Sequence, residues 1–195
     1  MRCLYCDKLI NKYNLFSLFI EEDELCLNCR QHLKVNKRYI YLDNLKIETF
    51  FEYDGIFRSL LLQYKECYDE ALSKIFLYEI KDYLRIKYHG YKLILMPSSL
   101  EKLKLRGFNH LELIFKDLGL EMNTGLKMKE ELIQEGKNYL ERSMMLDNYY
   151  YEGKKIDKLL LVDDVLTTGS SILGAYKALS KYTKIIKIVV LASKK

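Results

Sequence analysis

The segment 159–171 constrains the fold more strongly than any other part of the chain. Its first four residues, 159–162, are all apolar and predict a strand that is buried on both faces of a sheet. Two adjacent carboxylates, Asp163 and Asp164, follow this strand, and a Thr-Thr-Gly-Ser-Ser run then leads into a segment that predicts an amphipathic helix. A strand, a short loop and a helix in this order are typical of α/β proteins, which bind ligands at the carboxyl ends of their strands.

Each part of this segment has a chemical use. Vicinal carboxylates accept hydrogen bonds from vicinal ribose hydroxyls, or face a magnesium ion that a diphosphate carries. The first N–H groups of the helix favour a phosphate, and around them lie Thr167, Thr168, Gly169, Ser170 and Ser171. An ordinary strand, turn and Ser/Thr helix cap would explain this loop but not the paired carboxylates. A Walker loop is excluded, because no G-x-x-x-x-G-K-[ST] sequence occurs.

Four of the five cysteines form two C-x-x-C pairs, Cys3 with Cys6 and Cys26 with Cys29. Two such pairs can complete a tetrahedral thiolate shell, so they predict a closed, structural zinc site. Iron would use the same ligands. The alternatives are four buried or merely reactive thiols, or a redox dithiol, which normally opens a helix after a strand and in one copy. The fifth cysteine, Cys67, is expected to be a small buried hydrophobe.

Length and composition fit one α/β domain with a small appendage. The chain has 195 residues, of which 49% are hydrophobic. We expect residues 1–38 to form the metal module and a linker, and residues 39–195 to form the main domain. The net charge of +5 permits a nucleic acid or a phosphate-bearing partner. No apolar stretch approaches the roughly 18 residues of a membrane span, and no signal-peptide core is present, so we expect a cytoplasmic protein without membrane insertion.

Strands and helices alternate along the main domain. Hydrophobic periodicity predicts strands at 45–53, 93–96, 159–162 and 185–192, and helices at 56–64, 72–84, 107–118 and 170–181. The segment 121–155 is polar and poorly periodic, and the apolar run 15–20 predicts a small hairpin strand. This alternation predicts a mostly parallel sheet with helices on both faces.

Two basic residues outside the 159–171 segment are further candidates. Arg106 follows Lys102 and Lys104 and predicts a basic loop that covers a pyrophosphate, because a guanidinium binds that anion through two hydrogen bonds. A solvated charge run is the alternative for this loop, and also for Lys65.

Histidines and tyrosines give weaker signals. The three histidines, His32, His89 and His110, show no metal-ligand spacing and are interpreted as surface residues or as satisfied structural ones. The run at 149–151 is three tyrosines, with Lys154 and Lys155 close behind. Such a run can stack single-stranded bases, but we favour an aromatic edge of the core.

The segment 159–171 resembles the phosphoribosyl pyrophosphate motif of type I phosphoribosyltransferases. Together with the cysteine pairs and the run Arg106-Gly107-Phe108-Asn109, it makes the chain resemble the ComF (ComFC) competence family from Cys3 to the end. Further matches are Tyr64, Lys65 and Asp69 in a Tyr-Lys…Gly-Asp segment, and Gln134 and Arg142 in a Gln…Arg stretch. In place of a Pro-Val-Pro the chain has 96–99 as Met-Pro-Ser-Ser, and Tyr68 and His110 replace a Gly and a Gln.

The resemblance implies a type I phosphoribosyltransferase-like fold with an N-terminal zinc finger. It also implies that magnesium phosphoribosyl pyrophosphate binds with its 5-phosphate at 167–171 and its hydroxyls on Asp163 and Asp164, while Arg106 and Lys65 steady the leaving pyrophosphate. The implied role is single-stranded DNA uptake or processing in natural transformation, with DNA and an uptake helicase as partners. The alternative is an active phosphoribosyltransferase of nucleotide metabolism or salvage without a DNA role. The sequence specifies neither the acceptor nor the oligomeric state.

Overall fold

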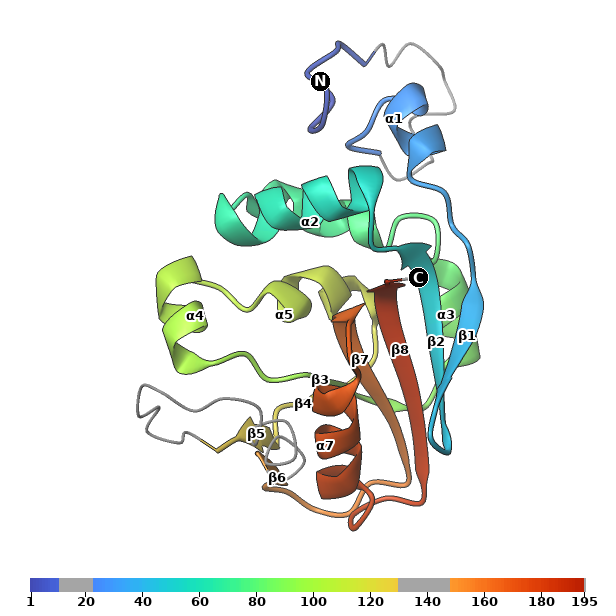
Figure 1. The fold of residues 1–195 in the computed structure, drawn as a ribbon, viewed down its shortest axis with the longest axis vertical. Coiled ribbons are helices and arrows are strands. Elements are labelled where there is room, and N and C mark those ends of the chain that lie inside the picture. Colours follow the sequence, from blue (N-terminus) through green and yellow to red (C-terminus); the bar gives the residue numbers. More distant parts are fainter. Residues whose placement is uncertain (11–22, 130–147, 195) are drawn as a thin grey trace.

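A six-stranded sheet forms the centre of the computed structural model, which describes residues 1–10, 23–129 and 148–194 (Figure 1). The strand order is β1-β2-β8-β7-β3-β4. Every neighbouring pair is parallel except β1 and β2, which form an antiparallel hairpin at one edge. The strands are β1 (Arg38–Leu42), β2 (Leu45–Glu52), β3 (Lys92–Leu95), β4 (Met122–Asn123), β7 (Lys158–Leu166) and β8 (Ile185–Ser193).

One helix precedes the sheet, and the others follow β2, β3 and β7 along the chain. They are α1 (Leu27–His32), α2 (Gly55–Glu66), η2 (Glu70–Phe76), α3 (Lys81–Lys87), α4 (Leu100–Arg106), α5 (His110–Phe115), η3 (Lys116–Leu118) and α7 (Ser170–Leu179). The connection from β2 to β3 and the connection from β7 to β8 run in opposite directions along the sheet. Right-handed crossovers then place their helices on opposite faces, and Figure 1 shows α7 in front of the strands and α3 behind β2.

The core lies on the two central strands. Residues 159–162 of β7 and 189–192 of β8 are fully buried, which is why both read as continuous apolar runs rather than alternating ones. A separate two-stranded hairpin, β5 (Leu126–Met128) with β6 (Tyr149–Tyr151), lies beside α7. The mostly parallel sheet with helices on both faces is thereby confirmed. No helix among the described residues is long and apolar enough to cross a bilayer.

Several element predictions need correction. The strand predicted at 159–162 continues to Leu166, because pairing with β8 extends to the partners Leu166 and Ser193. The helix predicted at 72–84 is divided into η2 and α3, and the one at 107–118 starts only at His110, after a left-handed Gly107 and the cap residue Asn109. The strands β1, β4, β5 and β6 were not predicted. The run 15–20 lies outside the described residues.

Gly169 fixes the turn between β7 and α7. Its φ of +78° is a left-handed backbone conformation that residues with a side chain rarely adopt. A Cβ atom at this position would also lie 2.2 Å from Cδ2 of Leu42. The glycine is therefore required for two reasons: its backbone conformation, and the close packing of β1 against the loop.

A substitution pair separates these two reasons. Gly90 has a nearly identical φ of +77° but open space around its Cβ position. We expect Gly90→Ala to cost about 1–2 kcal/mol through backbone strain alone, and Gly169→Ala to cost clearly more, because Leu42 must move as well. Denaturant unfolding of both variants measures the difference. Equal losses, or no recovery on adding Leu42→Ala to Gly169→Ala, would contradict the steric part of this explanation.

Candidate functional site

The carboxyl ends of β3 and β7 meet where the strand order reverses. From β3 the chain continues to the edge strand β4, whereas from β7 it returns through α7 to β8 on the other side. Open α/β sheets bind ligands in the crevice at such a point. A cavity of about 580 Å³ lies here, and its lining includes Lys65, Met96, Pro97, Ser98, Arg106, His110, Met128, Tyr149, Asp163, Asp164 and Ser171.

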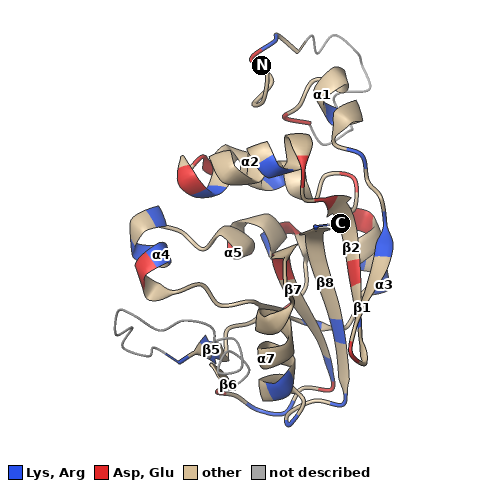
Figure 2. Cartoon of the chain, viewed as in Figure 1, with Lys and Arg blue, Asp and Glu red and all other residues tan. Residues whose placement is uncertain are grey.

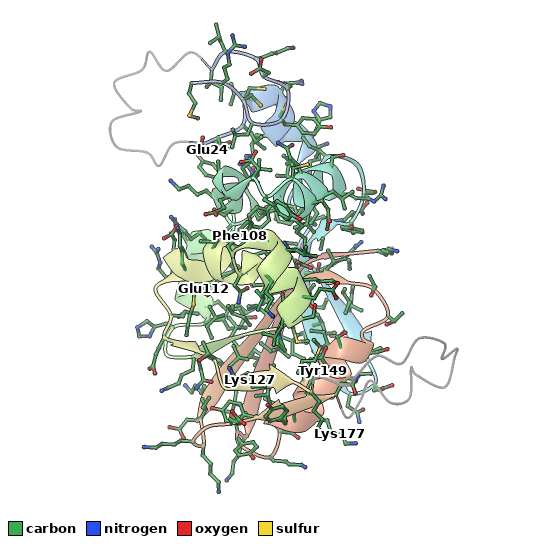
Figure 3. All side chains as sticks on the ribbon, turned by 90° about the vertical axis from the view of Figure 1, so that its left-hand side faces the viewer. Glu24, Phe108, Glu112, Lys127, Tyr149 and Lys177 are labelled. Carbon is green, nitrogen blue, oxygen red and sulfur yellow. The ribbon has the colours of Figure 1, made fainter. Side chains whose placement is uncertain are left out.

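Opposite charges surround this cavity. Figure 2 shows the acidic segment of β7 together with basic segments of α2 and α4. The β5–β6 hairpin supplies Met128 and Tyr149 to the lining. In Figure 3, Lys127 and Tyr149 of this hairpin lie below Phe108 and Glu112, which lie just before and within α5. The cavity is thus bounded by the sheet, by the basic helices and by the hairpin.

The two neighbouring carboxylates have different environments. Asp164 is 5% exposed, and its Oδ2 accepts hydrogen bonds from Nζ of Lys65 at 2.5 Å and from Nε2 of His110 at 2.6 Å. Burial raises the pKa of Asp164, but the His110 hydrogen bond and the Lys65 charge outweigh it and hold this pKa below its ordinary value. Burial and the negative charge of Asp164 raise the pKa of Asp163 to about 8. The ionised form is therefore more stable on Asp164 than on Asp163.

Arg106 is a buried wall residue rather than part of an open loop. The predicted basic loop is the helix α4, which ends at Arg106, and the Arg106 residue is 9% exposed. Its Nε donates to the backbone oxygen of Lys65 at 3.1 Å, and its Nη1 lies 3.0 Å from Nδ1 of His110. Lys102 and Lys104 are exposed on the same helix. The loop prediction was wrong because 100–106 is capped at Ser99, whose side chain accepts from the N–H of Lys102.

His110 is the site residue that the sequence interpretation missed. It is 5% exposed and lines the cavity, whereas it had been grouped with His32 and His89 as a surface or satisfied residue. Burial lowers the pKa of His110 below its ordinary value, although the hydrogen bond to Asp164 acts in the opposite direction. The only sequence signal was its position directly after Arg106-Gly107-Phe108-Asn109.

The hydroxyl-rich loop lies at the rim of the cavity. Thr167 and Thr168 are exposed, and Oγ1 of Thr168 lies 3.1 Å from Oγ of Ser170. Of the five residues 167–171, Ser171 is part of the cavity lining, and the other four form the turn that starts α7. Ser171 and Tyr149 both line the cavity, so this loop and the hairpin face the same space.

Two other features that the sequence singled out reach the site, and two residues lie outside the described part of the chain. Tyr68 lines the cavity and has a φ of +59°, so it occupies a conformation that favours glycine. Within the tyrosine run, Tyr151 is buried and packs on Tyr182, as expected for an aromatic core edge, while Tyr150 is 38% exposed. Gln134 and Arg142 lie outside the described residues. Cys67 is exposed, so its predicted burial was wrong.

The four paired cysteines form a group that can hold a metal ion. The sulfur atoms of Cys3, Cys6, Cys26 and Cys29 all lie within 4.8 Å of one another, and those of Cys6 and Cys26 are 3.7 Å apart. Four thiolates at about 2.3 Å from a tetrahedral ion would be separated by about 3.8 Å. Burial raises the pKa of Cys3, but hydrogen bonds from backbone groups of Cys26, Cys6 and Tyr5 outweigh it and lower this pKa to about 6. The residues therefore fit a closed structural site.

Arg30 connects this cysteine group to the main body. Its guanidinium forms two hydrogen bonds with Asp23, at 2.7 and 2.5 Å, and a third with the backbone oxygen of Ile75 at 3.2 Å. Leu25 and Leu33 on either side are buried in the same core as the sheet. The metal module is therefore packed on η2 rather than attached only through a linker.

The fold and the cavity define an α/β protein with an acidic pair at a topological switch point, joined to an N-terminal four-cysteine module. No model of a known protein family matches the sequence. The chain is 27% identical to competence protein ComFC of Streptococcus pneumoniae (strain ATCC BAA-255 / R6), over 93% of this chain and 94% of that protein. The predicted resemblance to the ComF family is thereby confirmed along nearly the whole chain.

A solved structure also aligns with the chain. Adenine phosphoribosyltransferase from Leishmania tarentolae gives a TM-score of 0.36 and 16% identity, over 85% of this chain and 87% of that chain.

The raised pKa of Asp163 gives a prediction about stability. An unfolded aspartate has a pKa of about 3.9. Between that value and about 8, the folded protein keeps a proton that the unfolded chain has released, so folding becomes less favourable as pH rises through this window. We therefore expect Asp163→Asn to raise the melting temperature of the ligand-free protein by a few degrees at pH 7.5 and by less at pH 5. Thermal unfolding at both pH values measures this, with the exposed Asp117→Asn as control. An equal or opposite effect at the two pH values would contradict it.

Proposed function

We propose that this protein binds phosphoribosyl pyrophosphate with magnesium and acts in DNA handling during natural transformation. One observation carries the first part: the acidic pair Asp163 and Asp164 lies in the carboxyl-terminal part of β7 at the switch point, in the same cavity as the cations Lys65 and Arg106. A sugar diphosphate presents hydroxyls and two anionic groups, and each has a matching group here. The cavity of about 580 Å³ is large enough for such a ligand.

Each group of the ligand has an assigned partner. The ribose hydroxyls donate to Asp163 and to the free oxygen of Asp164, which favours the ionised form of Asp163. The 5-phosphate binds at the start of α7, where Thr167, Thr168, Ser170 and Ser171 add hydroxyl donors and Gly169 gives the turn. Lys65 and Arg106 face the pyrophosphate, and magnesium enters with that pyrophosphate as its counter-ion.

The DNA role is supported by the relative and by the charge. Competence protein ComFC is named for competence, and this chain carries a net charge of +5, which favours a polyanionic partner such as single-stranded DNA. An uptake helicase is a second candidate partner. We further propose that residues 1–38 form the metal module and its linker and that the metal is zinc, in a protein that resides in the cytoplasm, where thiols stay reduced. Elemental analysis of the purified protein distinguishes zinc from iron.

A second candidate function is phosphoribosyl transfer to an acceptor that is not yet identified. The observation that favours it is the presence of two cations, Lys65 and Arg106, in the cavity wall. In this reaction the bond from the anomeric carbon to pyrophosphate breaks, the acceptor forms a new bond to that carbon, and pyrophosphate leaves with the bonding electrons. Cations that stabilise the departing charge would supply most of the catalysis, without a covalent enzyme intermediate.

Thermal unfolding with ligand tests the binding site. We expect 1 mM phosphoribosyl pyrophosphate with magnesium to raise the melting temperature by several degrees, because a ligand that binds only the folded state stabilises it. The shift should be lost in Asp163→Asn/Asp164→Asn, which keeps the side-chain volumes, and kept in Asp117→Asn. Each shift is compared with the same variant without ligand. The absence of a shift in folded, metal-loaded wild-type protein would contradict the proposed site.

Salt dependence tests the DNA role separately. We expect the protein to bind a fluorescent single-stranded oligonucleotide. The logarithm of the binding constant should fall linearly with the logarithm of the salt concentration, with a slope of about −0.7 for each phosphate that is neutralised. Fluorescence anisotropy titrations at salt concentrations from about 50 to about 300 mM measure this slope. No binding at the lowest salt concentration would leave the phosphoribosyl site without a DNA partner and favour the transferase alternative.

A further inference from the structure

The carboxylate of Asp164 belongs to a closed ring of side chains from four elements. Asp164 on β7 accepts from Nζ of Lys65 on α2 and from Nε2 of His110 on α5. Arg106 on α4 closes the ring, with Nη1 at 3.0 Å from Nδ1 of His110 and Nε on the backbone oxygen of Lys65. The ring therefore joins the end of the central strand to the helices that bound the cavity.

The ring fixes the protonation of His110 by geometry. A guanidinium has N–H donors and no acceptor, so Nδ1 of His110 must accept the hydrogen bond from Arg106. The imidazole proton of His110 is then on Nε2, which donates to Asp164. The other groups that face His110 agree: Ser98, after β3, lies 3.5 Å from Nδ1, and Tyr64 on α2 donates its hydroxyl to the His110 backbone oxygen at 2.7 Å. Lys65 adds a second positive charge near the imidazole of His110.

We propose that neutral His110 is the positioning residue of this site, because it holds Asp164 through Nε2–H and holds Arg106 in the cavity wall through Nδ1. The inference rests on the proposed binding of phosphoribosyl pyrophosphate. Oδ2 of Asp164 is used by two donors, which leaves the other oxygen for the ligand. Among the described residues, no carboxylate lies within ion-pair distance of Arg106, so its charge is available to an anion.

Other side chains at this position can reproduce one of these hydrogen bonds or neither. The amide nitrogen of glutamine is as many bonds from Cβ as Nε2 of histidine, so glutamine can keep the donor to Asp164. The oxygen of asparagine corresponds instead to Nδ1, so asparagine can accept from Arg106 but does not reach Asp164. Methionine fills the space without either hydrogen bond. These three substitutions divide the function of His110 into its parts.

Calorimetric titration of magnesium phosphoribosyl pyrophosphate tests the proposal. We expect His110→Gln to keep the wild-type affinity within about threefold, and His110→Asn and His110→Met to weaken it roughly 10-fold to 100-fold, because Asp164 loses a charge-assisted hydrogen bond. His89→Gln, at an exposed position, is the matched control for the exchange itself. Melting temperatures identify variants that fail to fold.

Nitrogen-15 NMR of the ligand-free wild-type protein gives a readout that does not depend on any variant. We expect the His110 imidazole to be neutral at pH 7, with its proton on Nε2. A proton on Nδ1, a charged ring, or wild-type affinity in a folded His110→Met variant would overturn the positioning role alone. If wild-type protein binds no phosphoribosyl pyrophosphate while the Nε2–H form is observed, the ligand site is wrong and the ring is only structural.

Discussion

A buried negative charge on Asp164 sets the geometry of the molecule around its cavity. An ionised carboxylate that is 5% exposed is stable only if donors replace its water, and here the donors come from α2 and α5. Neither helix is adjacent to β7 in sequence, so satisfying this one charge fixes how both helices lie against the sheet. Arg106 is then held in turn by His110 and by the backbone of α2. The site and the packing of these helices are therefore one arrangement.

The second carboxylate is stabilised differently, and this difference suits a ligand. Asp163 lies beside the negative charge of Asp164 and accepts a hydrogen bond from the N–H of Asp164. Among the described residues, no cation donates a hydrogen bond to Asp163. Its ionised form is therefore costly without a ligand, which is the usual sign of a group that stabilises a partner rather than the fold. Under the proposed function, ribose hydroxyls would supply the missing donors.

The sequence predicted what is encoded locally. The β7–loop–α7 unit, the parallel sheet and the four-cysteine group each depend on residues that are close together or on simple periodicity, and the structure has them. The ring around Asp164 could not be predicted, because it joins residues that are 99 and 54 positions apart, and only the fold brings these together. His110 carried no metal spacing, so it was taken for an ordinary histidine. The helix α4 was missed because a charge run without an apolar stripe does not reveal that its last residue is buried.

Two residues of the cavity wall, Tyr68 and His110, also have a structural role of their own. Tyr68 has a φ of +59°, a left-handed conformation that carries a steric cost which a glycine would avoid. The cost is tolerated at a position that lines the cavity, where the ring adds an aromatic surface to the ligand space. His110 donates to Asp164 through Nε2 and accepts from Arg106 through Nδ1. Because one residue bends the backbone and the other joins two charged groups, both shape the wall of the cavity, and His110 also holds its charges in place.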